Sequence, residues 1–255
     1  MVDPRPASRS IPPGAILDPM SLTRERREGV EILRLDRPGK RNALDTATLR
    51  LLNTALSELS SDADLRVVVL STTSSTAFCA GADVGEALDA AGGVARMEAF
   101  AETYRLVEEV PVPTIAVAVG NCVGAGAEII AGCDLRVVGD NLKLAWAGAR
   151  LGVPVGPARL TQLIGLSRAK ELIYTGRPIG AEQAVALGLA REVLPADAAE
   201  AAALELAEAI TRQSAAGVRH LKVMFRELER TSERIDYENS HLLAFQRDGA
   251  GLPQG

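Results

Sequence analysis

TIAVAVGNCVGAGAEIIAGCD, residues 114–134, is the stretch that decides the fold. It opens with an alternating β-branched run, Thr114 to Val119, which is typical of a strand. A glycine-rich turn follows, and helix-forming residues begin at Ala127. Glu128 therefore lies in the first turn of a helix, where unpaired backbone N–H groups favour negative charge. This arrangement predicts a site for an anion or a developing oxyanion.

A glycine-rich turn before a helix also occurs in other kinds of site and in ordinary tight turns. A dinucleotide fingerprint would require glycine at position 129, where the chain has Ile129. The sequence has no G-x-S-x-G elbow, P-loop or H-E-x-x-H motif, so those chemistries lose their usual support. On this stretch alone, a plain tight turn followed by a solvated Glu128 is an equally good interpretation.

Composition restricts the class of protein. A chain of 255 residues with 47% hydrophobic residues can form one large domain. Its apolar runs are too short to cross a bilayer, so we expect no membrane partner. The first residues, MVDPRPASRSIPPG, lack the apolar centre of a signal peptide, which predicts a cytoplasmic protein. The net charge of −5 without a basic block argues against nucleic acid as a partner.

Metal and histidine chemistry have little support. The three cysteines, Cys79, Cys122 and Cys133, lack zinc-site spacing and are expected to be reduced thiols. The only histidines, His220 and His241, lie in charged C-terminal segments that are predicted to be helical. We therefore expect neither a metal site nor a histidine-based triad.

A second segment repeats the construction of the first. Residues 66–70, RVVVL, form a nearly continuous apolar run of the kind that is buried on both faces of a sheet. The small-residue loop FCAGAD, residues 78–83, follows. A helix is expected after it, because Asp83 and Glu86 have capping-box spacing. Two strand–loop–helix units with parallel strands open their loops at one edge of the sheet. Two backbone N–H groups that converge there would suit a thioester oxyanion.

The rest of the chain is mostly regular. Residues 1–20 contain five prolines and are predicted to form a mobile arm. Strands are expected at 22–26 and 30–35, and a helix over 46–60 with Asp45 as its N-cap. Met97, Phe100, Tyr104 and Val107 mark a helix that ends before Pro111.

Beyond Pro157 the pattern is helical, and residues 249–255 are expected to be frayed. Apolar residues at helical spacing, including Phe225 and Leu228, indicate a layer that covers the site or forms subunit contacts. The expected helices are 158–164, 167–175, 181–188, 197–213, 215–230 and 232–246.

Four segments together resemble the crotonase (enoyl-CoA hydratase/isomerase) superfamily. They are LDRPGKRNALD, VVVLSTTSSTAFCAGADV, PTIAVAVGNCVGAGAEIIAGCDLRVV and RLTQLIGLSRAKELIYTGRPIGAEQAVALGLAREVLP. The resemblance covers about residues 22–248 and implies an α/β fold, a crotonase-like spiral of ββα turns followed by a C-terminal helical region. It assigns the spiral core to residues 21–195 and a helical trimerisation or lid region to residues 196–255. It also implies a homotrimer or a dimer of trimers.

The resemblance also implies which residues form the site. Backbone N–H groups of Ala82 and Ala125 would form an oxyanion hole for an acyl-CoA thioester, so that coenzyme A arrives with the substrate and no separate cofactor is expected. Asp83 is expected to be a helix cap rather than a catalyst. Further residues are expected beside the substrate or its coenzyme: Lys40, Arg41, Ala43, Ala80, Gly81, Asp83, Gly124, Trp146 and Gly148. For Lys40 and Arg41, ordinary solvated charges remain an equally good interpretation.

The sequence departs from the family pattern at one of the two catalytic carboxylates. Hydratases of the family use two glutamates; the first matches Glu128, whereas the second place, in LAWAGARLG, is occupied by Gly148. Adding water to an enoyl thioester needs both a base and an acid. Three hypotheses therefore stay open: a hydratase-type lyase, a decarboxylase or thioester hydrolase, and a non-catalytic acyl-CoA binder. Gly148→Glu is expected to raise hydration, and Trp146 either lines the acyl chamber or belongs to the core or a subunit contact.

Overall fold

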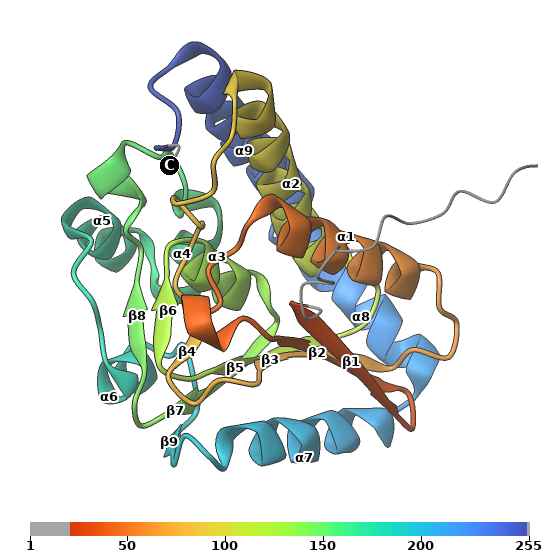
Figure 1. The fold of residues 1–255 in the computed structure, drawn as a ribbon. Helices are drawn as coiled ribbons and strands as arrows, with labels where there is room; N and C mark the ends of the chain where they lie inside the picture. Colours follow the sequence, from red (N-terminus) through yellow and green to blue (C-terminus); the bar gives the residue numbers. More distant parts are fainter. Residues whose placement is uncertain (1–20, 254–255) are drawn as a thin grey trace, which may run out of the picture.

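The computed structural model describes residues 21–253, and its strands form two sheets (Figure 1). The predicted arm, residues 1–20, lies outside the described residues. In the larger sheet β1 runs antiparallel to β2, and the other neighbours are parallel. Its strands, in spatial order, are β1 (Leu22–Arg27), β2 (Val30–Leu35), β3 (Val67–Thr72), β5 (Thr114–Ala118), β7 (Leu135–Gly139) and β9 (Val193–Leu194). The smaller, parallel sheet contains β4 (Ala77–Cys79), β6 (Asn121–Val123) and β8 (Lys143–Ala145).

The helices confirm the predicted pattern to within a few residues at most ends, except at the start of α2. They are α1 (Thr46–Ser60), α2 (Ala90–Glu109), α3 (Ala125–Gly132), α4 (Pro157–Ile164), α5 (Leu166–Thr175), α6 (Ala181–Ala186), α7 (Ala199–Thr211), α8 (Ala215–Leu228) and α9 (Thr231–Asp248). Two short 3-10 helices add Pro38–Lys40 and Gly148–Leu151. Asp45 caps α1 as expected, because its carboxylate accepts a hydrogen bond from the backbone N–H of Thr48.

The chain winds as repeated ββα turns. β3, β4 and α2 form one turn, and β5, β6 and α3 form the next. Each turn gives one strand to the large sheet and one three-residue strand to the small sheet. The implied α/β crotonase spiral is therefore confirmed. Both small-residue loops follow a strand of the small sheet, so the spiral brings them side by side.

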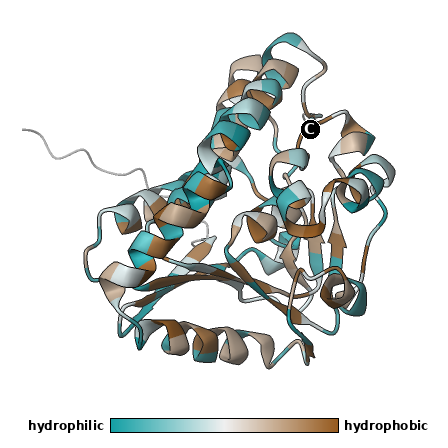
Figure 2. Cartoon of the chain, turned by 180° about the vertical axis from the view of Figure 1, so that it is seen from behind, coloured by the Kyte–Doolittle hydropathy of each residue, from teal (hydrophilic) through white to brown (hydrophobic). Residues whose placement is uncertain are grey.

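The large sheet is buried on both faces, as its apolar strands predicted. In β3, Val67 and Val69 pack against α7, whereas Val68 and Leu70 join the main core on the other face. This split follows the two-residue period of a strand. α7 lies along one face of the sheet (Figure 1) and packs with small side chains, and Figure 2 shows the strands as hydrophobic ribbons between the helical layers.

The helix expected immediately after Asp83 is absent, and this prediction was wrong. α2 begins at Ala90, and its N-cap is Asp89. The Glu86 carboxylate instead accepts a hydrogen bond from the backbone N–H of Thr46, the first residue of α1. The side chain that suggested a local capping box therefore caps a helix that is distant in sequence.

Candidate active site

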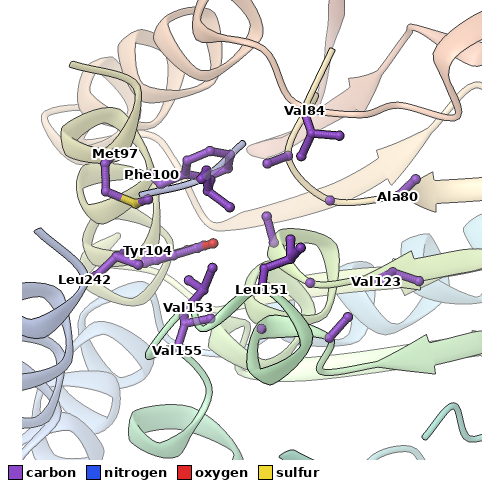
Figure 3. Close-up of a pocket in the computed structure, with 17 residues that line it drawn as sticks. Ala80, Val84, Met97, Phe100, Tyr104, Val123, Leu151, Val153, Val155 and Leu242 are labelled. Carbon is purple, nitrogen blue, oxygen red and sulfur yellow. The ribbon is translucent and has the colours of Figure 1, made fainter. Parts of the chain in front are cut away.

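A cavity of about 250 Å³ lies where the two small-residue loops face α2 (Figure 3). Its walls are almost entirely apolar, and among its lining side chains only Tyr104 carries a hydroxyl, amide or charged group. The lining residues are Ala80, Gly81, Ala82, Val84, Met97, Phe100, Tyr104, Val123, Gly124, Ala125, Ala147, Gly148, Leu151, Val153, Val155, Leu242 and Leu252. Five of the predicted site residues in the two loops therefore border one space.

The two expected donor residues, Ala82 and Ala125, both line the cavity. Leu44 bridges to the first loop on either side of Ala82, since its N–H donates to Gly81 and its carbonyl accepts from Asp83. Within residues 21–253 the backbone N–H groups of Ala82 and Ala125 have no acceptor. Ala125 is the first residue of α3, so its N–H is one of the unpaired donors of a helix start.

Glycines allow the two loops to approach each other. Gly81 and Gly124 have positive φ values of 105° and 54°, which residues with a Cβ rarely adopt. A Cβ on Gly124 would lie 4.0 Å from Cα of Gly81, so the loops are in direct contact. At Gly126 a Cβ would lie only 2.3 Å from the carbonyl oxygen of Cys79, so α3 can start this close to β4 only with glycine there.

The segment expected to contact coenzyme A is attached to the first loop. The backbone N–H of Ala80 donates to the carbonyl of Arg41 at 3.0 Å. The side chains of Lys40 and Arg41 are exposed, and Ala43 is half-buried beside them. Asp83 pairs with Arg37 at 3.3 Å and caps no helix.

Glu128 does not line the cavity, although its motif borders it. Its side chain is 1% exposed and pairs with Arg159, whose Nη1 lies 3.3 Å from Oε2. Its Oε1 is buried without a hydrogen-bond partner among the described residues. Burial and the negative charge of Glu238 raise the pKa of Glu128 to about 8, although Arg159 opposes the shift.

Arg159, on α4, is the centre of a buried charge cluster, which we define as Glu108, Glu128, Arg159 and Glu238. Its Nε lies 2.7 Å from a Glu108 oxygen and its Nη1 2.6 Å from a Glu238 oxygen. Burial raises the pKa of Glu108 to about 7. Burial lowers the pKa of Arg159, but the three carboxylates outweigh it and raise the pKa above its usual range. The cluster holds three carboxylates for one guanidinium, which favours a proton on at least one carboxylate.

Tyr104 separates the charge cluster from the cavity. The guanidinium carbon of Arg159 lies 4.8 Å from the centroid of the Tyr104 ring, a cation–π contact. Figure 3 shows the Tyr104 side chain reaching from α2 into the cavity, with its hydroxyl at the cavity end. Burial, and then the charge of Glu128, raise the pKa of Tyr104 well above its ordinary value, so the hydroxyl stays protonated.

Gly148 lies in the cavity wall and has no room for a larger side chain. A Cβ there would lie 2.8 Å from the carbonyl oxygen of Val153. Trp146, which we expected either beside the acyl group or in the core, is 2% exposed and belongs to the core cluster rather than to the cavity lining. Its indole lies next to Gly156.

The C-terminal segment folds back over the site instead of fraying. Leu252 lines the cavity, and its backbone N–H donates to the side chain of Gln246. Arg96, which is fully buried, donates to the carbonyl oxygens of Asp83 and Pro253. One guanidinium thus connects the first loop to the segment that closes the cavity, and the expectation of a frayed end was wrong for residues 249–253.

Metal sites and membrane spans find no support in residues 21–253. No group of three or more potential metal ligands occurs there. None of the helices in this part of the chain is both long and apolar enough to span a membrane.

Sequence reasoning missed Tyr104 and Arg159 as site residues. The helical pattern placed Tyr104 only in the buried stripe of its helix, although a phenol among Met97 and Phe100 brings a polar atom that needs a partner. Arg159 had no local signal, because its partners lie on α2, α3 and α9.

Comparison with known proteins agrees with this geometry. The family model for enoyl-CoA hydratase/isomerase matches residues 25–246. The chain is 35% identical over 201 residues to the probable enoyl-CoA hydratase echA8 of Mycobacterium tuberculosis, covering 78% of each chain. It is 34% identical over 217 residues to the enoyl-CoA hydratase EchA19 of the same species, covering 80% of each. The structure of an enoyl-CoA hydratase from Bacillus anthracis superposes with a TM-score of 0.77 at 29% identity, covering 92% of this chain and 99% of the other. The chain belongs to the enoyl-CoA hydratase/isomerase family, the crotonase superfamily.

Proposed function

We propose that the protein binds acyl-CoA thioesters and stabilises a thioester enolate with the backbone N–H groups of Ala82 and Ala125. The observation that carries this proposal is the pair of unpartnered donors on adjoining loops that face one apolar cavity. A thioester oxygen placed between them would receive two hydrogen bonds as negative charge develops. In mutational studies, one such donor contributes about 10²–10³ in rate.

Glu128 is the proposed acid–base residue of the site. Its pKa of about 8 lies near neutral pH, where a group both accepts and releases protons effectively. Because Glu128 does not line the cavity, proton exchange between Glu128 and the substrate needs an intervening group such as a water molecule. Glu128→Gln keeps the shape of the side chain but cannot accept the proton, so it should abolish turnover.

Hydration of a 2-enoyl thioester is the reaction suggested by the family, but the cavity gives a second candidate specific support. No carboxylate lines the cavity, although hydration requires a base to activate water. Decarboxylation of a malonyl-type thioester requires less. The bond between Cα and the carboxylate breaks, CO₂ leaves, and the electron pair passes to the enolate, which then takes a proton at Cα. Apolar walls would disfavour the charged carboxylate and favour neutral CO₂.

Proline at position 125 offers a sharp test of the oxyanion hole. Ala125 is the first residue of α3, where proline is well tolerated, so Ala125→Pro removes the N–H with little cost to the helix. Ala90→Pro is the matched control, because Ala90 is the first residue of α2 and does not line the cavity. We expect calorimetry with butyryl-CoA to show binding for the unmutated protein and for Ala90→Pro, and much weaker binding for Ala125→Pro. Absence of binding by the unmutated protein would overturn the proposal.

Turnover then separates the candidate reactions. Hydration of crotonyl-CoA and decarboxylation of methylmalonyl-CoA are measured in parallel. Release of free CoA from butyryl-CoA is measured as well and reports thioester hydrolysis. Conversion of only one substrate identifies the reaction, and butyryl-CoA binding without any conversion indicates a non-catalytic acyl-CoA binder.

We also propose that the protein is a homotrimer or a dimer of trimers. In the single chain, α8 exposes large apolar side chains that a subunit interface would cover: Leu221, Val223, Met224, Phe225 and Leu228. Their clustering on one helix supports an interface there.

A further inference from the structure

The Tyr104 hydroxyl faces the cavity and has no hydrogen-bond partner within residues 21–253. The residue as a whole is only 4% exposed, and it lines the cavity. Figure 3 shows this oxygen at the end of a side chain that crosses the cavity from α2 toward the two loops. All other side chains in the cavity wall are hydrocarbon, apart from the weakly accepting thioether of Met97.

The ring and the hydroxyl of Tyr104 have separable roles. The ring packs beside Phe100, with centroids 6.1 Å apart, and lies under the guanidinium of Arg159. A phenylalanine would keep both contacts. Only the hydroxyl is left without a structural task. An acyl group that fills the cavity displaces water from this hydroxyl, so binding leaves it unpaired unless the ligand brings an acceptor atom.

We propose that Tyr104 is a specificity-determining residue whose hydroxyl donates a hydrogen bond to an oxygen on C3 of the acyl group. The proposal rests on the proposed function, in which Ala82 and Ala125 bind the thioester oxygen on C1. Because the loops hold C1 from one wall and Tyr104 reaches in from the opposite wall, its hydroxyl faces the acyl chain beyond Cα. The substrate class is therefore acyl-CoA thioesters oxygenated at C3, which include 3-hydroxyacyl, 3-oxoacyl and malonyl-type groups.

The charges around Tyr104 fix its role as a donor. The neighbouring Glu128 disfavours a phenolate, so the hydroxyl keeps its proton and presents it to an acceptor oxygen. A site built to hydrogen-bond a substrate oxygen discriminates strongly against the analogue that lacks it, because the buried group is then left unpaired. Hydrocarbon acyl groups should therefore bind more weakly than their C3-oxygenated analogues.

Two ligands and two variants test this inference. Butyryl-CoA and 3-oxobutyryl-CoA differ only in the oxygen on C3, and neither can lose water. Their dissociation constants are measured by calorimetry at mildly acidic pH, where the 3-oxo ligand is un-ionised. Tyr104→Phe removes the hydroxyl and keeps the ring. Tyr174→Phe is the control, because Tyr174 is 73% exposed on α5 and outside the cavity.

We expect the unmutated protein and Tyr174→Phe to bind 3-oxobutyryl-CoA at least about tenfold more tightly than butyryl-CoA, which corresponds to one hydrogen bond. Tyr104→Phe should lose that preference while binding butyryl-CoA at least as tightly as before. A merely structural role would change both affinities equally.

Each contrary result has a distinct meaning. An unchanged preference in Tyr104→Phe, or no preference in the unmutated protein, overturns the role of Tyr104 and leaves thioester binding intact. Failure of the unmutated protein to bind either thioester overturns the proposed function and this inference together.

Discussion

Arg159 forms an ion pair with Glu128 at 3.3 Å, and both side chains are 1% exposed. The same arginine also forms ion pairs with Glu108 and Glu238, and its guanidinium lies against the ring of Tyr104. Because the three buried carboxylates share one guanidinium, removing that cation should destabilise the fold far more than removing one partner of a surface ion pair would.

Arg159→Met should therefore be strongly destabilising. It leaves buried carboxylates without a cation, and breaking a buried ion pair by removing one partner costs about 3–5 kcal/mol. The free energy of unfolding in urea measures this loss. Arg177→Met is the control, because the pair of Arg177 with Glu171 is exposed and should contribute little to stability. An equal decrease in the free energy of unfolding in the two variants would show that the buried cluster contributes no more to stability than a surface ion pair.

Stability should fall as the pH rises toward mildly alkaline values. The pKa of Glu128 is about 8 and that of Glu108 about 7 in the folded chain, against 4.5 ordinarily. Between these values the folded state binds more protons than the unfolded state. The stabilisation from these two groups is thus complete below pH 4.5 and is lost progressively above it, until about pH 7 for Glu108 and about pH 8 for Glu128, at up to about 1.4 kcal/mol per pH unit for each group.

The variant Glu128→Gln checks the sign of this effect. It removes the contribution of Glu128, so the free energy of unfolding should decline less steeply with pH than in the unmutated protein. Glu171→Gln, at an exposed position, serves as the control. A steeper decline in Glu128→Gln would contradict the raised pKa.

Gly148→Glu should fail to create a hydratase, contrary to the expectation from sequence. Its Cβ would lie 2.8 Å from the carbonyl oxygen of Val153, so the backbone has to shift before the new carboxylate can be placed. Such overpacking typically costs about 1–3 kcal/mol, and a displacement of about 1 Å can cost about 10²-fold in rate. Crotonyl-CoA hydration and thermal unfolding are measured for Gly148→Glu and for Gly148→Ala, which separates crowding from charge. A large gain in hydration by the glutamate variant alone would refute this prediction.

Charge on α8 should disrupt assembly. Leu228 is 79% exposed and Phe225 60% exposed in the single chain. Phe225→Glu and Leu228→Glu together place two negative charges on the proposed interface, and light scattering should report a smaller species. Tyr237→Glu, at another exposed aromatic residue outside α8, should leave the mass unchanged. A monomeric unmutated protein would rule out the proposed oligomer.

The elements that sequence predicted best are those with strong local patterns. The β-branched runs of β3 and β5 and the apolar stripes of the later helices have clear periods, and they lie where expected. The glycines and alanines of the two loops are also a local signal, because small residues in corresponding positions of two similar units indicate a close approach. These features predicted that the two loops meet at one edge of the sheet, and the resemblance to the crotonase superfamily then identified Ala82 and Ala125 as the residues that face each other there.

What sequence did not reveal depends on contacts between distant segments. β4, β6 and β8 have three residues each, too few to show a period, so the sequence pattern predicted only loops there. The position of Glu128 outside the cavity follows from Arg159, which lies 31 residues further along the chain. Tyr104 approaches the loops only because α2 packs across them. None of these relationships has a local signature.

One wall of the cavity is formed by Leu252, in the segment after α9 that belongs to no helix or strand. Arg96 holds this segment by donating a hydrogen bond to the carbonyl oxygen of Pro253. The wall is therefore open to variation at low structural cost, since replacing Leu252 disturbs neither sheet. Changes to a few residues after α9 should therefore alter which groups fit the cavity while the spiral and both loops stay as they are. For protein engineering, the segment after α9 is the natural place to randomise when a different acyl length is wanted.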